Sequence, residues 1–425
     1  MKKSVLFMAI LAAIAVLAGC NKTGDDPASD NPEEIEEVTE EIQARPIELT
    51  YAETRVGKSV NGFGLDVFRK LQAEGQQKDL LFSPFSLSLD FALCAGGGEA
   101  ETKNQILKTL GFAEKKAEDV AGYYKKMVEG LVTVDPSTKF LSANSVWVHK
   151  AYSLRDSFKD YASDYFNADL VSLDLLKKES LAQINRWCAS HTEGMIEKVV
   201  DDSRDPDAAA VSYLLNALYF KSGWSIPFEE KTQEGIFHGV SGDRTATFLQ
   251  KEAKYGYYEK ENAQFVMVPY GNGSYFLVIA LPKEGVSLSG MMDSLSENDF
   301  FVNDLRDPVR LRLPKFDIEY NTGDLLIPVL QGMGMTAPFN STQADFSAMF
   351  TDKTPFCINQ VLQKAVISVD EKGTEASAVT VIGMAMSNGE PYTPVLRTVT
   401  VDRPFAFALV EFSSRTILFL GQKMQ

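Results

Sequence analysis

The sequence predicts an α+β protein, because helical and strand-like segments are grouped along the chain rather than alternating. The first half contains stretches with apolar residues at helical spacing, and the second half contains runs of β-branched and aromatic residues bounded by turn residues. Strict alternation would instead predict a parallel α/β sheet. From about residue 56 onward there is no repeat and no low-complexity break, so we expect one domain.

Three segments of the first half have helical spacing: VNGFGLDVFRKLQAE (60–74), FSLSLDFALCAGG (85–97) and SLAQINRWCASHTEG (180–194). The glycines at 96–98 follow the second segment, so they indicate the end of a helix rather than a phosphate-binding loop. Gly194 is expected to end the third segment.

The strand-like runs of the second half combine β-branched and aromatic residues with turn residues at both ends. They are AVSYLLNALYFKS (210–222), QFVMVPYG (264–271), YFLVIALP (275–282), VRLRLPKFDIEY (309–320), KAVISVD (364–370) and PFAFALVEFSSRTILFLGQ (404–422).

Residues 1–19 are predicted to be a lipoprotein signal peptide. Lys2 and Lys3 precede an apolar run, 5–17, that is too short to span a membrane. The quartet LAGC, which ends at Cys20, resembles a bacterial lipobox, in which Cys20 becomes the lipidated first residue of the mature protein. The alternative is ordinary signal cleavage beside an incidental cysteine.

Residues 20–50 are predicted to be a lipidated cysteine followed by a flexible acidic tether, because they are rich in Asp and Glu and poor in aromatic residues. The folded domain is then 51–425. These features predict a lipid-anchored protein of the bacterial cell envelope, on its periplasmic face or at the cell surface. Asn21, where an Asp would favour the inner membrane, favours the outer membrane.

Composition and motifs argue against an enzyme. Hydrophobic residues make up 45% of the 425 residues, and the net charge of −16 argues against a nucleic-acid partner. The spacing of Cys94, Cys188 and Cys357 fits neither a zinc site nor a redox pair, so free buried thiols are expected, although a disulfide remains open outside the cytoplasm. No HExxH, GxSxG or Walker motif occurs. We predict no catalytic site, metal or cofactor.

Several segments in order resemble the serpin family across residues 56–425. They are LLFSPFSLSLDFALCAGGGEAETKNQI (80–106), INRWCASHTEGMIEKVV (184–200), LLNALYFKSGWSIPFEEKTQEGIFH (214–238), LRLPKFDIEY (311–320), LQGMGMTAPFNSTQADFSAM (330–349), CINQVLQKAVISVDEKGTEASA (357–378) and DRPFAFALVEFSSRTILFLGQ (402–422). The resemblance implies about nine helices packed on three β-sheets, with an exposed reactive loop at about 371–397 that can insert into the central sheet.

The resemblance also implies a function. A serpin of the inhibitory kind is a monomeric suicide inhibitor of serine proteases, and of cysteine proteases in some cases, which traps the protease as a covalent acyl complex by inserting the cleaved loop as a new strand. The alternative is a non-inhibitory serpin that acts as a binding or carrier module. Such relatives usually carry bulky, charged or Pro residues in the hinge, and GTEASAVT does not.

The hinge has the pattern that insertion requires. Thr374, Ala376, Ala378 and Thr380 share one face of an extended strand and are all small, so they can enter a packed interior. Gly373 frees the backbone at the bend. The predicted hinge residues are Glu371, Gly373, Thr374, Glu375, Ala376, Ser377 and Ala378.

The bait bond is placed by resemblance, about sixteen residues after the hinge glutamate. This spacing gives Ser387–Asn388, with Met386–Ser387 and Met384–Ala385 as alternatives, and the register can also slide towards Tyr392. Small or Met bait residues suit elastase- or subtilisin-like proteases rather than trypsin-like ones.

Residues that control sheet opening are also carried over by resemblance. Ser83, Ser86 and Asn216 match the shutter, where the sheet parts, and Trp224 matches the breach, where insertion begins. Lys315 is expected to pair with the hinge carboxylate Glu371. One departure is Gln363, which stands where the family commonly has a His in the shutter and which can still donate and accept hydrogen bonds.

Overall fold

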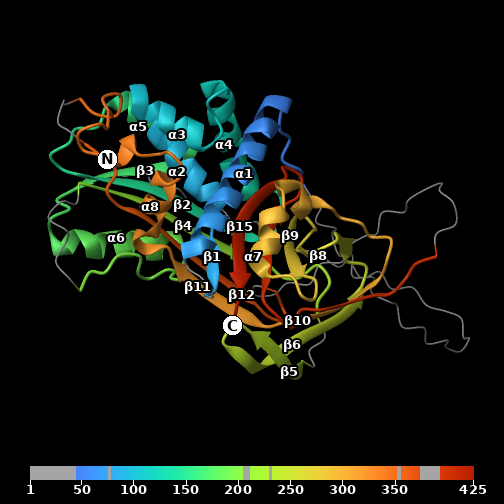
Figure 1. The fold of residues 1–425 in the computed structure, drawn as a ribbon. Helices are drawn as coiled ribbons and strands as arrows, with labels where there is room; N and C mark the ends of the chain where they lie inside the picture. Colours follow the sequence, from blue (N-terminus) through green and yellow to red (C-terminus); the bar gives the residue numbers. More distant parts are fainter. Residues whose placement is uncertain (1–44, 75–77, 204–210, 229–231, 352–355, 374–392) are drawn as a thin grey trace, which may run out of the picture. The chain divides into compact units, whose positions relative to one another are not determined.

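The computed structural model describes residues 45–74, 78–203, 211–228, 232–351, 356–373 and 393–425 (Figure 1). These residues form eight α-helices, three short 3-10 helices and fifteen strands in three sheets. The α+β prediction is therefore confirmed. Within the described part of the chain, no helix combines the length and apolar character needed to cross a membrane.

The helices lie mostly in the first half of the chain. They are α1 (Tyr51–Glu74), α2 (Pro84–Gly97), α3 (Ala100–Thr109), α4 (Ala117–Leu131), α5 (Asp156–Phe166), α6 (Lys178–His191), α7 (Leu288–Ser294) and α8 (Leu326–Gln331), with 3-10 helices η1 (Glu297–Phe301), η2 (Gly323–Leu325) and η3 (Ala337–Phe339).

Local sequence signals mark the ends of two of these helices. Ser83 caps α2 by accepting a hydrogen bond from the Ser86 amide, and Pro84 occupies the first helical position, where its missing N–H costs nothing. The helix α6 ends at His191, and Gly194 follows in the left-handed region with φ +82°.

The three sheets are built from strands far apart in the sequence. In spatial order, the six-stranded sheet contains β1 (Leu80–Phe82), β15 (Thr416–Lys423), β14 (Phe405–Glu411), β9 (Tyr275–Pro282), β8 (Ala263–Tyr270) and β7 (Gly256–Glu259). The four-stranded sheet contains β13 (Arg397–Thr400), β10 (Val309–Pro314), β6 (Gly242–Ala253) and β5 (Gln233–Gly239). The five-stranded sheet contains β11 (Phe316–Asn321), β12 (Val361–Val369), β4 (Ser212–Lys221), β2 (Lys139–His149) and β3 (Ala168–Leu173).

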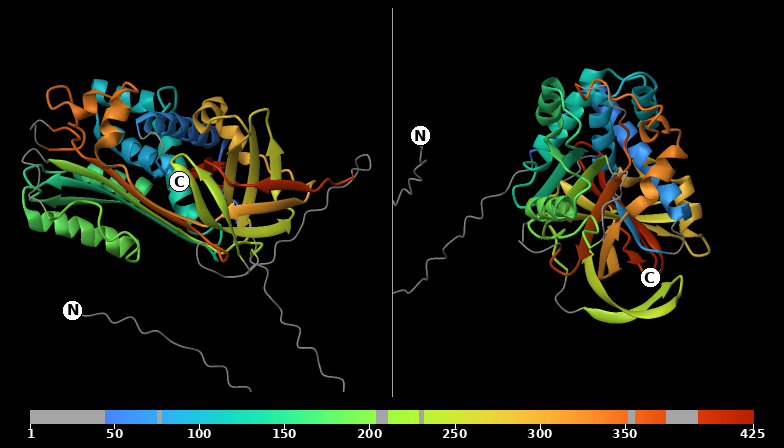
Figure 2. Two further views of the ribbon diagram at one scale, coloured as in Figure 1. Left: turned by 60° about the horizontal axis from the view of Figure 1, so that its bottom comes forward. Right: turned by 90° about the vertical axis from the view of Figure 1, so that its left-hand side faces the viewer.

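The strand β4, in the centre of the five-stranded sheet, is buried on both faces. Alternate residues of β4 point to opposite sides: Leu214 and Leu218 join the main core, whereas Leu215 and Ala217 join a smaller cluster beneath α6. The helix α6 lies across the outer face of this sheet (Figure 2, left). Burial on both faces explains why β4 reads as a nearly continuous apolar run.

One predicted strand is divided between two sheets. The run 309–320 forms β10 in the four-stranded sheet and β11 in the five-stranded sheet, with Lys315 between them. Pro314 has no amide hydrogen. A change from one sheet to the other at this residue therefore costs no hydrogen bond from Pro314. The Lys315 amide instead donates to the Thr247 carbonyl at 2.8 Å.

Candidate functional site

The central feature of the five-stranded sheet is an incomplete seam between β12 and β4. These two strands are parallel, and their pairing runs from Val361↔Leu214 to Ala365↔Leu218. On the far side of β4, the ladder with β2 continues to Lys221. On the far side of β12, the ladder with β11 continues to Val369. Over the described residues, β12 and β4 are therefore paired along one part of their length only.

A tight turn stands at the open end of this seam. The amide and carbonyl groups of Asp370 and Gly373 face each other in a reciprocal pair of bonds, both 3.4 Å long, and the Lys372 amide donates to Oδ1 of Asp370 at 2.8 Å. Gly373 has φ +111°, and a Cβ there would lie 2.4 Å from the Ser222 carbonyl oxygen. Only glycine fits this position, which reverses the chain direction after β12.

Trp224 closes the open end from the β4 side. Its indole Nε1 donates to the Asp370 carbonyl at 2.8 Å, and its amide donates to the Lys372 carbonyl at 3.3 Å. Its ring stacks on Tyr270 with the ring centroids 4.1 Å apart, and the residue is 1% exposed. The structure therefore places the breach tryptophan against the predicted hinge turn.

Lys315 and Glu371 meet, as the sequence predicts. The Lys315 Nζ lies 2.5 Å from Oε2 of Glu371. This hydrogen bond is the main reason why the pKa of the Glu371 carboxyl is lowered. Because Lys315 joins β10 to β11, the pair ties the turn after β12 to the junction between two sheets.

The shutter residues Ser83 and Gln363 are joined in both directions. The Ser83 amide donates to Oε1 of Gln363 at 2.7 Å, and Nε2 of Gln363 donates to the Ser83 carbonyl at 3.1 Å. The Ser83 hydroxyl in turn donates to the Ser86 hydroxyl at 3.0 Å. All three residues are buried, so a neutral amide that both donates and accepts serves this position without a titrating group.

Asn216 lies beside Gln363 in the ladder but bonds elsewhere. The two residues are Cα partners across the seam, yet the Asn216 amide donates to the side chain of Asn144 on β2. The sequence did not identify Asn144. It also did not identify Thr322, whose hydroxyl accepts a hydrogen bond from the backbone amide of Gln363 at 3.1 Å. The sequence gives little signal for Asn144, because Ser142 and Ser145 make the residues around it polar as well.

Some predicted residues lie outside the described part of the chain. These are Cys20, the hinge residues Thr374, Glu375, Ala376, Ser377 and Ala378, and the bait-bond candidates Met384, Met386, Ser387 and Asn388.

Among the residues that the structure describes, neither the cysteines nor the side chains that could ligate a metal form a second candidate site. Cys94 and Cys188 are buried and Cys357 is half-buried, and all three are free thiols. Burial raises the pKa of the Cys188 thiol to about 12, so this thiol stays protonated at neutral pH. No cluster of metal-ligating side chains occurs among the residues that the structure describes.

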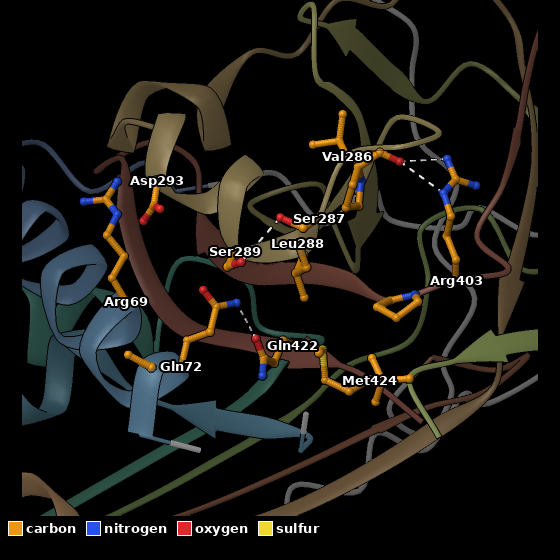
Figure 3. A pocket seen from close by; sticks show the side chains of 14 residues that line it. Arg69, Gln72, Val286, Ser287, Leu288, Ser289, Asp293, Arg403, Gln422 and Met424 are labelled. Atoms are coloured by element: carbon orange, nitrogen blue, oxygen red, sulfur yellow. Dashed lines mark hydrogen bonds between the residues drawn. The ribbon is translucent and has the colours of Figure 1, made fainter. Parts of the chain in front are cut away.

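A cavity of about 570 Å³ opens between α1, α7 and the ends of β14 and β15 (Figure 3). Several polar groups of its walls have hydrogen-bond partners within the protein. Nε2 of Gln72 donates to Oε1 of Gln422 at 2.7 Å, the Arg69 guanidinium donates to the Met292 and Leu295 carbonyls, and Arg403 donates to the Pro282 carbonyl.

Comparison with known proteins decides the family. The family model described as "Serpin (serine protease inhibitor)" matches residues 58–425. The chain belongs to the serpin family. Serpins are mostly protease inhibitors rather than catalysts, and the serpin resemblance and fold predicted from the sequence are therefore confirmed.

Two relatives and two solved structures illustrate the match. Iripin-2 of Ixodes ricinus is 30% identical over 87% of this serpin and 93% of its own length, and intracellular coagulation inhibitor 2 of Tachypleus tridentatus is 30% identical over 85% and 89%. The thermophilic serpin tengpin in its native state has a TM-score of 0.77 and 30% identity over 90% and 97%. Human thyroxine-binding globulin also has a TM-score of 0.77, but at 23% identity over 88% and 99% it shows the fold alone.

Proposed function

We propose that this serpin is a suicide inhibitor of serine proteases that traps the acyl-enzyme by inserting its cleaved loop into the five-stranded sheet. The observation that carries the proposal is the incomplete seam between β12 and β4, with a chain-reversing turn at its open end. A relative whose name is intracellular coagulation inhibitor 2 supports an inhibitory role.

The geometry of the turn defines how a new strand would run. The strands β12 and β4 are parallel to each other. A strand that continues from the turn at Gly373 back into the seam runs antiparallel to both. It therefore replaces one parallel ladder by two antiparallel ladders, and antiparallel pairing is slightly the more stable per residue.

The chemistry of trapping follows from this movement. The protease serine attacks the bait carbonyl, forms an ester with the loop and releases the new amino terminus. Insertion of about 16 residues at about 3.3 Å each moves the esterified protease by roughly 50 Å along the sheet. Displacement of catalytic groups by even about 1 Å can cost a factor of about a hundred in rate, so a distorted protease no longer hydrolyses the ester.

The proposed targets are proteases with elastase- or subtilisin-like pockets. Bait candidates at 384–388 are small or Met residues, whereas a trypsin-like pocket with an acidic base selects Arg or Lys. Cysteine proteases form a further target class, because a thioester at the same bond would be displaced in the same way.

The second candidate function is that of a carrier. The cavity between α1 and α7 favours it, and the name of thyroxine-binding globulin shows that one protein of this fold is a carrier. Against it, Gln72 and Gln422 bond to each other and Arg403 bonds to the Pro282 carbonyl (Figure 3), so these groups already have partners and are less available to orient a ligand.

Incubation with a panel of serine proteases separates the two functions. We expect an SDS-stable covalent complex, one per molecule, with elastase- or subtilisin-like enzymes. Cleavage of the loop without a complex would favour the carrier. Mass spectrometry of the released C-terminal fragment would identify the bait bond.

We also propose that Cys20 is lipidated and holds the protein in the outer membrane of a bacterial envelope. Cys20→Ser should release the protein from the membrane fraction or leave it unprocessed, while a domain beginning at about residue 46 should inhibit normally. Absence of a radioactive fatty acid from the wild-type protein after metabolic labelling would overturn the anchor.

A further inference from the structure

A buried carboxylate, Asp135, stands behind the open end of the seam. It lies in the turn between α4 and β2 and is 1% exposed. Oδ1 accepts from the amide and the hydroxyl of Ser137 at 2.9 and 2.7 Å. Oδ2 accepts from the Thr138 hydroxyl at 2.7 Å and from the Asn272 amide at 3.1 Å. Four donors thus converge on one carboxylate.

The first route from Asp135 to the hinge turn passes through a hydroxyl pair. Because the Thr138 hydroxyl donates its single proton to Asp135, it accepts from the Ser222 hydroxyl, 2.6 Å away. Ser222 follows directly after β4, and its carbonyl oxygen packs so closely on Gly373 that no side chain fits there.

The second route passes through the turn between β8 and β9. Asn272, which donates to Asp135, follows Gly271, whose amide donates to the Gly223 carbonyl at 2.8 Å. Gly271 has φ +50°, and a Cβ on it would lie 1.9 Å from Oδ2 of Asp135, so this turn is pressed against the carboxylate. Gly223 itself forms a β-bridge with Gly373.

Residues 222–224 contact the hinge turn through their backbone and through the Trp224 indole, whose Nε1 donates to the Asp370 carbonyl at 2.8 Å. The backbone contacts are the Gly223–Gly373 bridge and the 3.3 Å bond from the Trp224 amide to the Lys372 carbonyl. From behind, this segment is held by the 2.9 Å bond from the Ser225 amide to the Pro269 carbonyl, by the Trp224–Tyr270 bridge and by the two routes that lead back to Asp135. A carboxylate acceptor strengthens the four hydrogen bonds that Asp135 accepts directly.

We propose that Asp135 is a positioning residue that fixes the C-terminal end of β4 against the hinge turn. It thereby sets the rate at which the seam opens for loop insertion. This inference rests on the proposed inhibitory function. In an Asp135→Asn variant one acceptor oxygen is replaced by an amide group that cannot accept, so two of the four donors lose their partner.

Hydrogen exchange of the intact protein tests the proposal. We expect the amides of 222–225 to exchange about tenfold faster in Asp135→Asn than in wild type, with unchanged exchange in β14 and β15. Thr138→Val removes the hydroxyl bridge to Ser222 at nearly equal volume and should act in the same direction, which keeps the test decisive if the first variant folds poorly.

Asp345→Asn is the matched control. Asp345 heads a similar Asp-x-Ser turn, with its Oδ1 3.0 Å from the Ser347 amide, but the bonds described for it do not lead to the hinge turn. Unchanged exchange at 222–225 in Asp135→Asn and Thr138→Val, or faster exchange that extends equally through β14 and β15, would overturn the proposal.

The inhibitory readout separates this inference from the proposed function. On incubation without protease, Asp135→Asn should lose inhibitory activity about tenfold faster than wild type through spontaneous insertion. If wild type traps no protease, the proposed function fails, while the exchange measurement still decides whether Asp135 positions the C-terminal end of β4. If wild type traps protease and the variant loses activity no faster, Asp135 does not control opening.

Discussion

At the residue scale, Asp90 is a carboxyl group that the proposed mechanism does not use. It lies on α2 at 3% exposure. Burial raises the pKa of its carboxyl well above the ordinary value. Burial is also the main reason why the pKa of the Cys94 thiol and that of the Tyr124 hydroxyl are raised, and Asp90 adds to both shifts. The native state therefore holds this proton more tightly than the unfolded chain does.

The sign of the pH dependence follows from this difference. The stabilising contribution of the protonated carboxyl is complete below the unfolded pKa of 3.8 and is lost as the pH rises through the raised folded pKa. Asp90→Asn should therefore remove this part of the pH dependence and raise the melting temperature at pH 8 by roughly 2 °C or more.

Melting temperatures of wild type and Asp90→Asn between pH 5 and pH 9 check this prediction. Asp317→Asn on the exposed side of β11 is the control and should follow wild type. A variant curve parallel to that of wild type would show that Asp90 does not titrate with folding.

Residue roles were predictable from sequence where a short motif carries them. The positions of Trp224, Gly373 and the Lys315–Glu371 pair followed from segments that resemble a known family. The role of Asp135 was not predictable, because its links to the hinge turn pass through Asn272, which bonds to Asp135 itself, and through Ser222, which bonds to Thr138. Both residues are more than 80 positions away, and only the fold brings them close. Hydrogen-bond partners at such separations leave no local pattern.

At the element scale, the apolar pattern of the sequence identified apolar helices and buried apolar strands better than it identified strands with polar residues. The helix α2 and the strands β4, β8 and β9 lie where the sequence predicts them. The strand β2 was missed because its sequence, KFLSANSVWVH, places Ser142, Asn144 and Ser145 in its middle and so lacks a β-branched run. Tertiary burial overrides this weak local preference.

The element on which the proposed function depends is the strand that the hinge would form. In the proposed mechanism, Thr374 is the first residue that would turn inwards when insertion starts. A charge there would enter the sheet interior unpaired, at a cost of several kcal/mol, and slow insertion by orders of magnitude relative to deacylation. Thr374→Arg should therefore turn the inhibitor into a substrate that is cut at the same bond while the protease escapes.

Glu375→Arg is the control for this strand, because the side chain at 375 would face the opposite side of the inserted strand, so its effect should be much milder. Titration of a susceptible protease with both variants gives the moles of inhibitor consumed per mole of protease trapped. If Thr374→Arg traps protease as well as wild type does, the proposed register of the inserting strand is wrong.

At the scale of the whole molecule, the proposal makes the native fold a metastable one. The sheet holds two parallel strands, β12 and β4, paired from Val361↔Leu214 to Ala365↔Leu218. The chain that could complete the seam is tethered to one end of it through the turn at Gly373. A covalently closed loop keeps its far end at β13, which pairs with β10 in another sheet. Cleavage is what removes this restraint.

Cleavage of the loop between Met384 and Asn388 should therefore raise the melting temperature of the protein. A new strand with a neighbour on each side gains two ladders of hydrogen bonds in place of one short ladder, at about 1 kcal/mol net for each bond. A net gain of about 10 kcal/mol corresponds to a rise of roughly 13 °C for a domain of this size. The measurement is calorimetry of the intact and the cleaved protein, with the mobility of the cleaved chain checked on a denaturing gel. Equal melting temperatures before and after cleavage would leave the serpin fold in place but rule out loop insertion, because a strand added to the centre of a sheet cannot be energetically silent.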